Sequence, residues 1–256
     1  MPLGAGLRHA ELAIPSVSDS LAAKLLPFVL ASIAGSVDVI GFLGLNGLFT
    51  AHVTGNLVIL AAHIVTGSEA PLPWLISVPV FIIGLALTQL LAAGLKSARI
   101  APLPVLLLLQ FVLLCAFLVI CLDAASGASP NAPSMIIAGM LGVSAMAAQN
   151  ALVRIALIGA PSTAVLTTNI TILTTDVGEI LLGRDANRVA KARDRAKHTW
   201  PAVAGFLLGC TLGALSEAAV GLLSLVLPAG LALIAVVLGI RASLSPANTS
   251  SSVRKE

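Results

Sequence analysis

Five long apolar runs constrain the fold of this chain more than any other feature. Each is close to or longer than the roughly 18–20 residues that cross a hydrocarbon core. Only 10% of the 256 residues are charged, against about 25% in an ordinary soluble domain. The sequence therefore predicts an all-α integral membrane protein, because lipid cannot pair free backbone polar groups. The runs are Leu21–Leu45, Leu72–Leu95, Leu103–Leu122, Ser134–Ile158 and Trp200–Leu223.

Positively charged residues fall in alternate connections between these runs. Arg184–His198 contains six basic residues and two acidic ones, whereas the connections around Gly67–Pro73 and Asp123–Pro133 contain no Lys or Arg. Lys and Arg concentrate in cytoplasmic loops, so the alternation predicts six crossings with both chain ends in the cytoplasm. Residues 1–20 are expected to be a retained cytoplasmic segment, and the Ser-rich tail 242–256 to be disordered.

Two further apolar segments carry clusters of Thr and Asn, namely Gly47–Val65 and Ala160–Gly183. Each follows a full-length run after a Gly-bearing break, "GLNG" or "LIGAP". We interpret both segments as half-helices or re-entrant segments. If both crossed the membrane instead, the chain would have eight spans, four in each half, and Lys96 and Arg99 would lie outside.

The two polar segments are copies of one another. "TAHVTGNLVIL" at Thr50–Leu60 returns as "TAVLTTNITIL" at Thr163–Leu173, 113 positions later (163 − 50). This predicts a first membrane repeat over 21–123 and a second over 134–241, the second with a basic cytoplasmic loop at 184–198. Three spans per repeat invert the second copy, so we expect six transmembrane helices as two inverted three-helix repeats, each with a broken or re-entrant helix.

The residues around the first break also carry a family resemblance. "AGSVDVIGFLGLNGLFTAHVTGNLVIL", with Gly-x-x-Asp on a span and Thr-Gly-Asn downstream, resembles the YoaK-type family of bacterial membrane proteins, a family of unknown function. The resemblance covers about Leu21 to Arg241 and implies a multi-span protein of the bacterial inner membrane, without a substrate. The second copy departs from the pattern, because it reads Thr-Thr-Asn and has Ala151 in the place of Asp38.

Asp38 is the first candidate for function, since an ionised carboxylate inside a span is costly. Arg154 is its expected partner, because it lies in the fourth span and aligns with Gly41, nearly one turn from Asp38. One interpretation is a fixed ion pair that locks two helices. The other is a responsive pair at a solute site, for which Asp38→Asn should abolish uptake.

The polar clusters at the breaks are the second candidate, either as a binding site or as caps and contacts between helices. Polar residues at helical spacing after each break predict a stripe that lines a cavity or faces another helix. The candidate substrate-binding residues are Asp38, Thr54, Gly55, Asn56, Gln149, Asn150, Arg154, Thr167, Thr168 and Asn169. The candidate polar stripe is His52, His63, Asp176 and Glu179. The glycines Gly205, Gly209 and Gly213, at four-residue steps, predict close helix packing instead.

No nucleotide, metal or cofactor motif is found in the sequence, so an ATP-driven pump is excluded and neither a cofactor nor a metal is expected. The leading hypothesis is a small-solute secondary transporter with a midplane site shared by the two repeats. A membrane scaffold or channel subunit and an intramembrane lipid-modifying enzyme are the alternatives. The expected partners are membrane lipids and an unidentified solute, with no nucleic acid; association of identical copies is left open.

Overall fold

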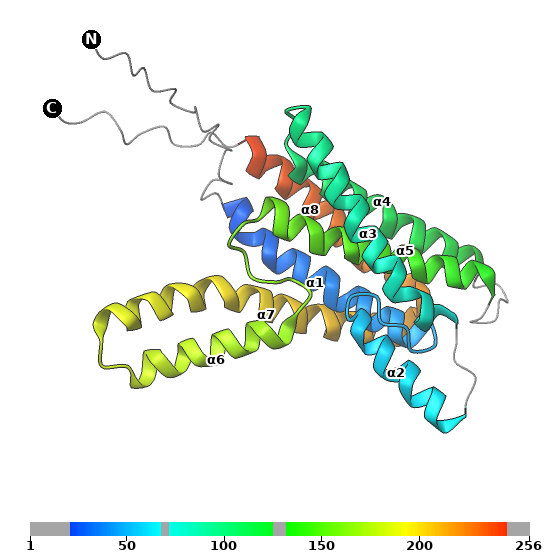
Figure 1. Cartoon of the computed structure of the whole chain (residues 1–256), viewed down its shortest axis with the longest axis horizontal. Helices are drawn as coiled ribbons and strands as arrows, with labels where there is room; N and C mark the ends of the chain where they lie inside the picture. The colour runs from blue at the N-terminus through cyan, green and yellow to red at the C-terminus, as the bar shows by residue number, and fades with distance from the viewer. Residues whose placement is uncertain (1–20, 68–71, 125–131, 245–256) are drawn as a thin grey trace, which may run out of the picture.

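The computed structural model describes residues 21–67, 72–124 and 132–244, all in helices and their connections without any strand (Figure 1). The predicted N-terminal segment 1–20 and all but the first three residues of the predicted tail 242–256 lie outside these ranges. The helices are α1 (Leu21–Gly44), α2 (Val53–Thr66), α3 (Leu72–Ser97), α4 (Pro102–Ala124), α5 (Pro133–Ala156), α6 (Leu166–Leu182), α7 (Ala186–Val220), the 3₁₀ helix η1 (Gly221–Leu225) and α8 (Val226–Leu244).

The prediction of an all-helical, multi-span membrane protein is confirmed at this level. Five stretches of the described chain are long and apolar enough to span a membrane, the last of which runs through α7, η1 and α8. The helix α2 is apolar but has only 14 residues, which is too short to cross the bilayer alone. In the apolar window of α1, 72% of the residues are buried, against 17% for α3, so α1 is central and α3 faces outward.

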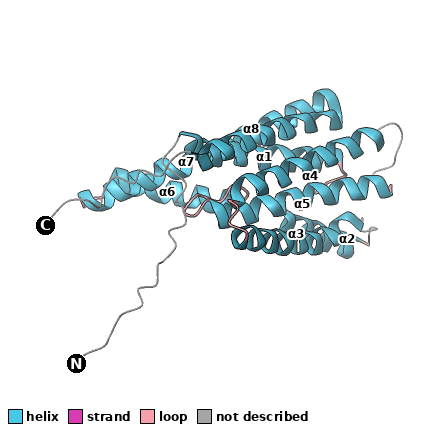
Figure 2. Cartoon of the chain, turned by 90° about the horizontal axis from the view of Figure 1, so that it is seen from above, coloured by secondary structure: helices cyan, strands magenta, loops and turns pink. Residues whose placement is uncertain are grey.

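The two central helices, α1 and α5, run antiparallel. Gln149 on α5 bonds the backbone of Leu30, whereas Leu45 at the far end of α1 lies against Gly139. Each central helix packs mainly on helices of the other half of the chain: α1 contacts α7 and α8, and α5 contacts α3 and α4. Figure 2 shows this order, with α1 and α5 between α7 and α8 on one side and α3 on the other.

Glycines bring α1 and α7 into close contact along parallel axes. A Cβ at Gly205 or Gly209 would collide with the backbone oxygen of Phe28 or Ser32, and one at Gly35 with that of Phe206. Small residues at such an interface let helix backbones approach closely without lipid between them. The packing role predicted for the glycine steps of α7 is thus confirmed.

Two helical hairpins extend from opposite ends of the bundle (Figure 1). In one, α2 runs back along α3, with His63 against Trp74 at a ring centroid distance of 4.6 Å. In the other, α6 runs back along the first half of α7, where Arg195 donates to Asp176. The two hairpins occupy equivalent positions in the two halves, because α2 follows the first break and α6 follows the second.

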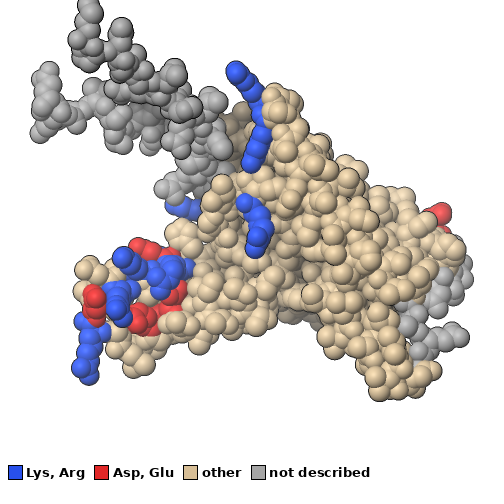
Figure 3. Space-filling view, in the orientation of Figure 1, with Lys and Arg blue, Asp and Glu red and all other residues tan. Residues whose placement is uncertain are grey.

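The described Lys and Arg residues gather at one end of the bundle. They occur near the N-terminal ends of α1 and α7, near the C-terminal ends of α3, α5 and α8, and in the short connections between helices there. Figure 3 shows them over the half of the surface that holds the α6–α7 hairpin, and none at the opposite end. The molecule therefore has one basic end and one end that is nearly free of positive charge.

Candidate functional site

The first helix break separates α1 from α2. The chain turns at Asn46 and Gly47, whose φ angles are 54° and 83°, and returns toward the bundle before α2 begins at Val53. Left-handed backbone of this kind is common for Gly and Asn and rare for other residues. The pair "NG" in the first break is thus the local reason that α1 stops there.

Asp38 closes this break. Its Oδ1 accepts hydrogen bonds from the backbone N–H groups of Thr50, Ala51 and His52 at 2.8, 2.8 and 3.2 Å. Its Oδ2 lies 2.7 Å from Nδ1 of His52. Consecutive N–H groups that converge on one oxygen form an anion cradle, and charge-assisted bonds of this kind are strong. The buried carboxylate is therefore bound by the broken backbone itself.

Asn56 holds the same loop in place from the side of α2. Its side-chain amide exchanges two hydrogen bonds with the backbone of Phe49, at 2.9 and 2.8 Å, and donates a third to Ser77 on α3 at 3.0 Å. Asn56 is fully buried. Every polar atom of its side chain is thus committed within the protein, so Asn56 clamps the loop and has no group left for a solute.

The second break, between α5 and α6, keeps the register of the first break and one of the hydrogen bonds of its asparagine. The helices α1 and α5 both have 24 residues, and α6 begins at Leu166, which is offset from Val53 by the same 113 positions. Asn169 donates to the backbone oxygen of Ser162, as Asn56 does to that of Phe49. The predicted duplication of the broken segment therefore extends to its hydrogen bonds.

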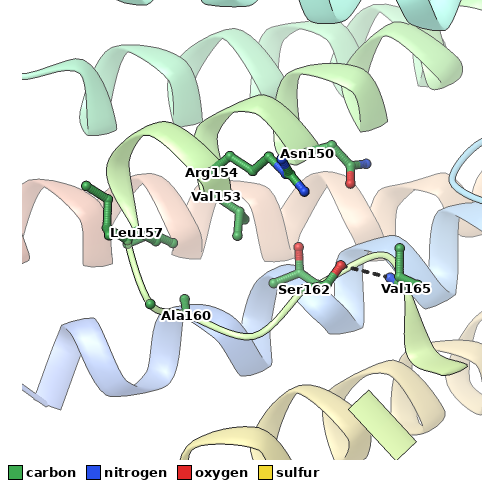
Figure 4. Close-up of a pocket in the computed structure, with 10 residues that line it drawn as sticks. Asn150, Val153, Arg154, Leu157, Ala160, Ser162 and Val165 are labelled. Carbon is green, nitrogen blue, oxygen red and sulfur yellow. Dashed lines mark hydrogen bonds between the residues drawn. The ribbon is translucent and has the colours of Figure 1, made fainter. Parts of the chain in front are cut away.

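Unlike the first break, the second one is open. A pocket of about 410 Å³ lies between the last turns of α5 and the loop that leads to α6. Figure 4 shows Arg154 and Asn150 side by side on α5, with Ser162 on the facing loop. Arg154 forms no ion pair with any residue of the described ranges. The lining residues are Asn150, Val153, Arg154, Leu157, Ile158, Gly159, Ala160, Ser162, Thr163 and Val165.

Gln149 ties the second break to the centre of the bundle. Its Nε2 donates to the backbone oxygen of Leu30 and to Oγ1 of Thr163, both at 2.9 Å, and its Oε1 accepts from Gln110 at 2.6 Å. All three polar side chains are buried. Gln110 and Thr163 are absent from the predicted site, although a lone Gln within the apolar run of α4 was a usable signal.

The structure does not bring the predicted site residues together in one place. Asp38 binds the first break, and Arg154 lines the pocket at the second, so they form no ion pair. Thr163 lies level with Leu30, eight residues from Asp38, which is about 12 Å along an ideal helix. The side chains of Thr54, Thr167 and Thr168 are exposed on α2 and α6, and Gly55 packs on the ring of Phe49.

The predicted polar stripe also divides between the two hairpins. His52 binds Asp38 and contacts the ring of Phe206, and His63 packs on Trp74. Asp176 is buried and bound by Arg195, and Glu179 is half-buried nearby on α6. Within the described ranges, no group of three His, Cys, Asp or Glu residues could hold a metal ion.

Fold and site together define a class of protein: a helical, multi-span membrane protein with two matching helix breaks, one closed by its own carboxylate and one open. The chain belongs to the DUF1275 family, because the family model described as "Protein of unknown function (DUF1275)" matches residues 26–238. The YoaK-type proteins that its sequence resembles belong to this family. Searches of curated proteins and of solved structures found no match to the chain.

Proposed function

We propose that this protein is a small-solute permease or secondary transporter of the bacterial cytoplasmic membrane, with the pocket beside Arg154 as its solute site. One observation carries the proposal: the pocket opens at a helix break whose counterpart in the other half is sealed by Asp38. Broken helices in corresponding positions of two halves are typical of transporter binding sites. A solute path that is open at only one end requires one open break and one closed break.

The two halves are inverted repeats in this proposal, and six helices cross the membrane. Two features support the inversion. The helices α1 and α5 run antiparallel, and each packs on the third and fourth helices of the other half: α1 on α7 and α8, and α5 on α3 and α4. The six crossings are α1, α3, α4, α5, α7 and α8. The helices α2 and α6 return to the surface from loops that re-enter the bundle.

The basic end of the bundle lies in the cytoplasm, following the positive-inside rule. Both chain ends are then cytoplasmic, and the Arg154 pocket opens on the cytoplasmic side, because Arg154 is in the last turn of α5 at that end. The Asp38 break lies toward the opposite face. The solute path therefore runs between two separate breaks, and this replaces the shared midplane site that the sequence suggested.

The pocket favours binding and passage over catalysis. Arg154 is the one ionisable residue among the ten that line it, and arginine side chains do not exchange protons near neutral pH in proteins. General acid–base chemistry needs a group that can gain and lose a proton near neutral pH.

The test is whether the pocket is reached from both sides of the membrane. A Ser162→Cys variant, in a background in which Cys115, Cys121 and Cys210 are replaced by Ser, is treated with a membrane-impermeant thiol reagent in right-side-out and inside-out vesicles. A transporter that alternates its access is labelled in both. Ser97→Cys, exposed at the basic end, is the control that reacts from one side only. Labelling of Ser162→Cys from one side alone contradicts transport and favours the scaffold alternative.

A further inference from the structure

The first break contains its own ligand, which indicates what the second break binds. By the offset of 113 positions, Thr163, Ala164 and Val165 match Thr50, Ala51 and His52, whose N–H groups hold Asp38. The position of Asp38 itself is Ala151 in the second half. The second break therefore keeps the loop that forms the cradle and lacks the carboxylate that fills it.

The N–H groups of the second loop are correspondingly free. Those of Thr163 and Ala164 make no hydrogen bond with any residue of the described ranges, and that of Val165 reaches only Oγ of Ser162, at 3.2 Å. Both Thr163 and Ala164 are buried residues. Backbone N–H groups inside proteins are nearly always paired, so the free N–H of Thr163, which lines the pocket, and that of Ala164, the next residue, point to an absent acceptor.

Arg154 marks a second difference between the two breaks. Its counterpart is Gly41, where a Cβ would lie 3.0 Å from the backbone oxygen of Leu48 and 3.1 Å from Cγ2 of Thr50. The first loop thus packs directly on α1, which a larger side chain at this position prevents. On α5 the arginine lines the pocket, where it supplies a guanidinium.

We infer that the pocket takes a small solute with a carboxylate group, a proposal that rests on the proposed function and names its substrate class. A carboxylate oxygen suits the loop N–H groups, as Asp38 demonstrates in the first break. The guanidinium of Arg154 is the best side-chain partner for such a group, and Asn150 lies beside it. The other lining residues, among them Val153, Leu157 and Ser162, carry no charge, so the rest of the solute is uncharged.

The test measures binding by calorimetry on the whole protein in nanodiscs of zwitterionic phosphatidylcholine, in phosphate-free buffer. The probes are benzoate and butyrate, each paired with its neutral amide, and inorganic phosphate. We expect at least one of the acids to bind and its amide to fail. Arg154→Gln should weaken binding about tenfold or more, since a charge-assisted bond of about 1.5 kcal/mol or more is lost.

Ala151→Asp is the sharpest variant, because it places a carboxylate where the first half has Asp38. It should abolish binding of the acids, while the control Ala151→Ser keeps it. The inference is overturned if neither acid binds, if the amides bind equally well, or if Ala151→Asp binds as tightly as the wild type. Binding of phosphate without either acid also overturns it, and nanodiscs with added phosphatidylglycerol then show whether a lipid headgroup competes for the pocket.

The two proposals fail separately. If Ser162→Cys is labelled from both sides but neither acid binds, the proposal of transport is supported and the proposal of a carboxylate-bearing solute is rejected. If an acid binds and the Arg154 and Ala151 variants behave as expected, but labelling occurs from one side only, the binding site is supported and the proposal of transport is rejected.

Discussion

Asp38 shows how a carboxylate can be buried in a membrane span by bonding to backbone N–H groups and to a histidine, His52. The sequence correctly marked it as exceptional, since a charge within a span needs compensation. Its partner could not be predicted, because the pattern of residues does not reveal that the broken backbone returns to Asp38. Arg154 was the expected partner as the nearest cation in a matching position, but it lies at the other break, because α1 and α5 run antiparallel.

Replacing Asp38 should destabilise the protein strongly. In Asp38→Ala the N–H groups of Thr50 and Ala51 lose their acceptor inside the bundle. We expect the free energy of unfolding to fall by about 3 kcal/mol or more, as when one partner of a buried charged group is removed. Equilibrium unfolding in detergent measures this change.

Asp38→Asn is the matched control, because it keeps an oxygen acceptor and removes the charge. Its loss should be smaller, about 1–2 kcal/mol. Added formate should raise the melting temperature of Asp38→Ala and leave that of the wild type unchanged. An Asp38→Ala protein as stable as the wild type would show that the cradle does not depend on Asp38.

At the scale of elements, the interface of α1 and α7 was predictable and the closing of the breaks was not. Glycines at four-residue steps indicate close packing whatever the partner helix, and Gly205, Gly209 and Gly213 of α7 all pack against α1. The clusters after each break were correctly located. Their side chains serve different roles, however: the two Asn residues clamp their loops, whereas the Thr residues lie exposed on the helices.

A methyl group at Gly209 should separate α1 from α7. Its Cβ would overlap the backbone of Ser32, which cannot move without shifting α1. Gly209→Ala should therefore lower the free energy of unfolding by about 1–3 kcal/mol, the usual penalty of overpacking. The control is Gly230→Ala on α8, where nothing lies within 4 Å of the added atom. Equal melting temperatures of the two variants would contradict this packing.

The two clamping asparagines offer a comparison within one molecule. Asn56 makes three hydrogen bonds and Asn169 one. Asn56→Ala should therefore destabilise the protein by about 1–3 kcal/mol more than Asn169→Ala, at about 1 kcal/mol per buried bond and more for stranded partners. Thermal unfolding of both variants measures the difference, and a larger effect at Asn169 would refute the assignment of the tighter clamp to the first break.

At the scale of the whole molecule, the separation of the two breaks follows from the antiparallel course of α1 and α5. Each break comes at the C-terminal end of its central helix, and α1 and α5 run in opposite directions, so the breaks lie toward opposite ends of the bundle. The offset of 113 positions and the number of long runs were visible in the sequence. The expectation of one shared site did not take account of where the antiparallel course of α1 and α5 places the two loops.

The proposed orientation is open to a direct test. Ser97→Cys at the basic end should be protected from an impermeant thiol reagent in intact cells, whereas Asp123→Cys, at the end of α4, should react. Both positions are exposed on the protein surface. Disrupting the membrane should make the two variants react alike, which controls for local access. The opposite pattern in intact cells would reverse the orientation and place the pocket outside.

The central claim is that the two breaks are copies of one structural element, of which the first is closed by Asp38 and the second is open. Asn150 and Val37 are equivalent by the offset of 113 positions; Asn150 lines the pocket, and Val37 is fully buried. The decisive measurement is the alkylation rate of cysteine at each position in purified protein without native cysteines. The account predicts fast alkylation of Asn150→Cys and slow alkylation of Val37→Cys until Asp38→Ala is added. Equal rates at the two positions would contradict it.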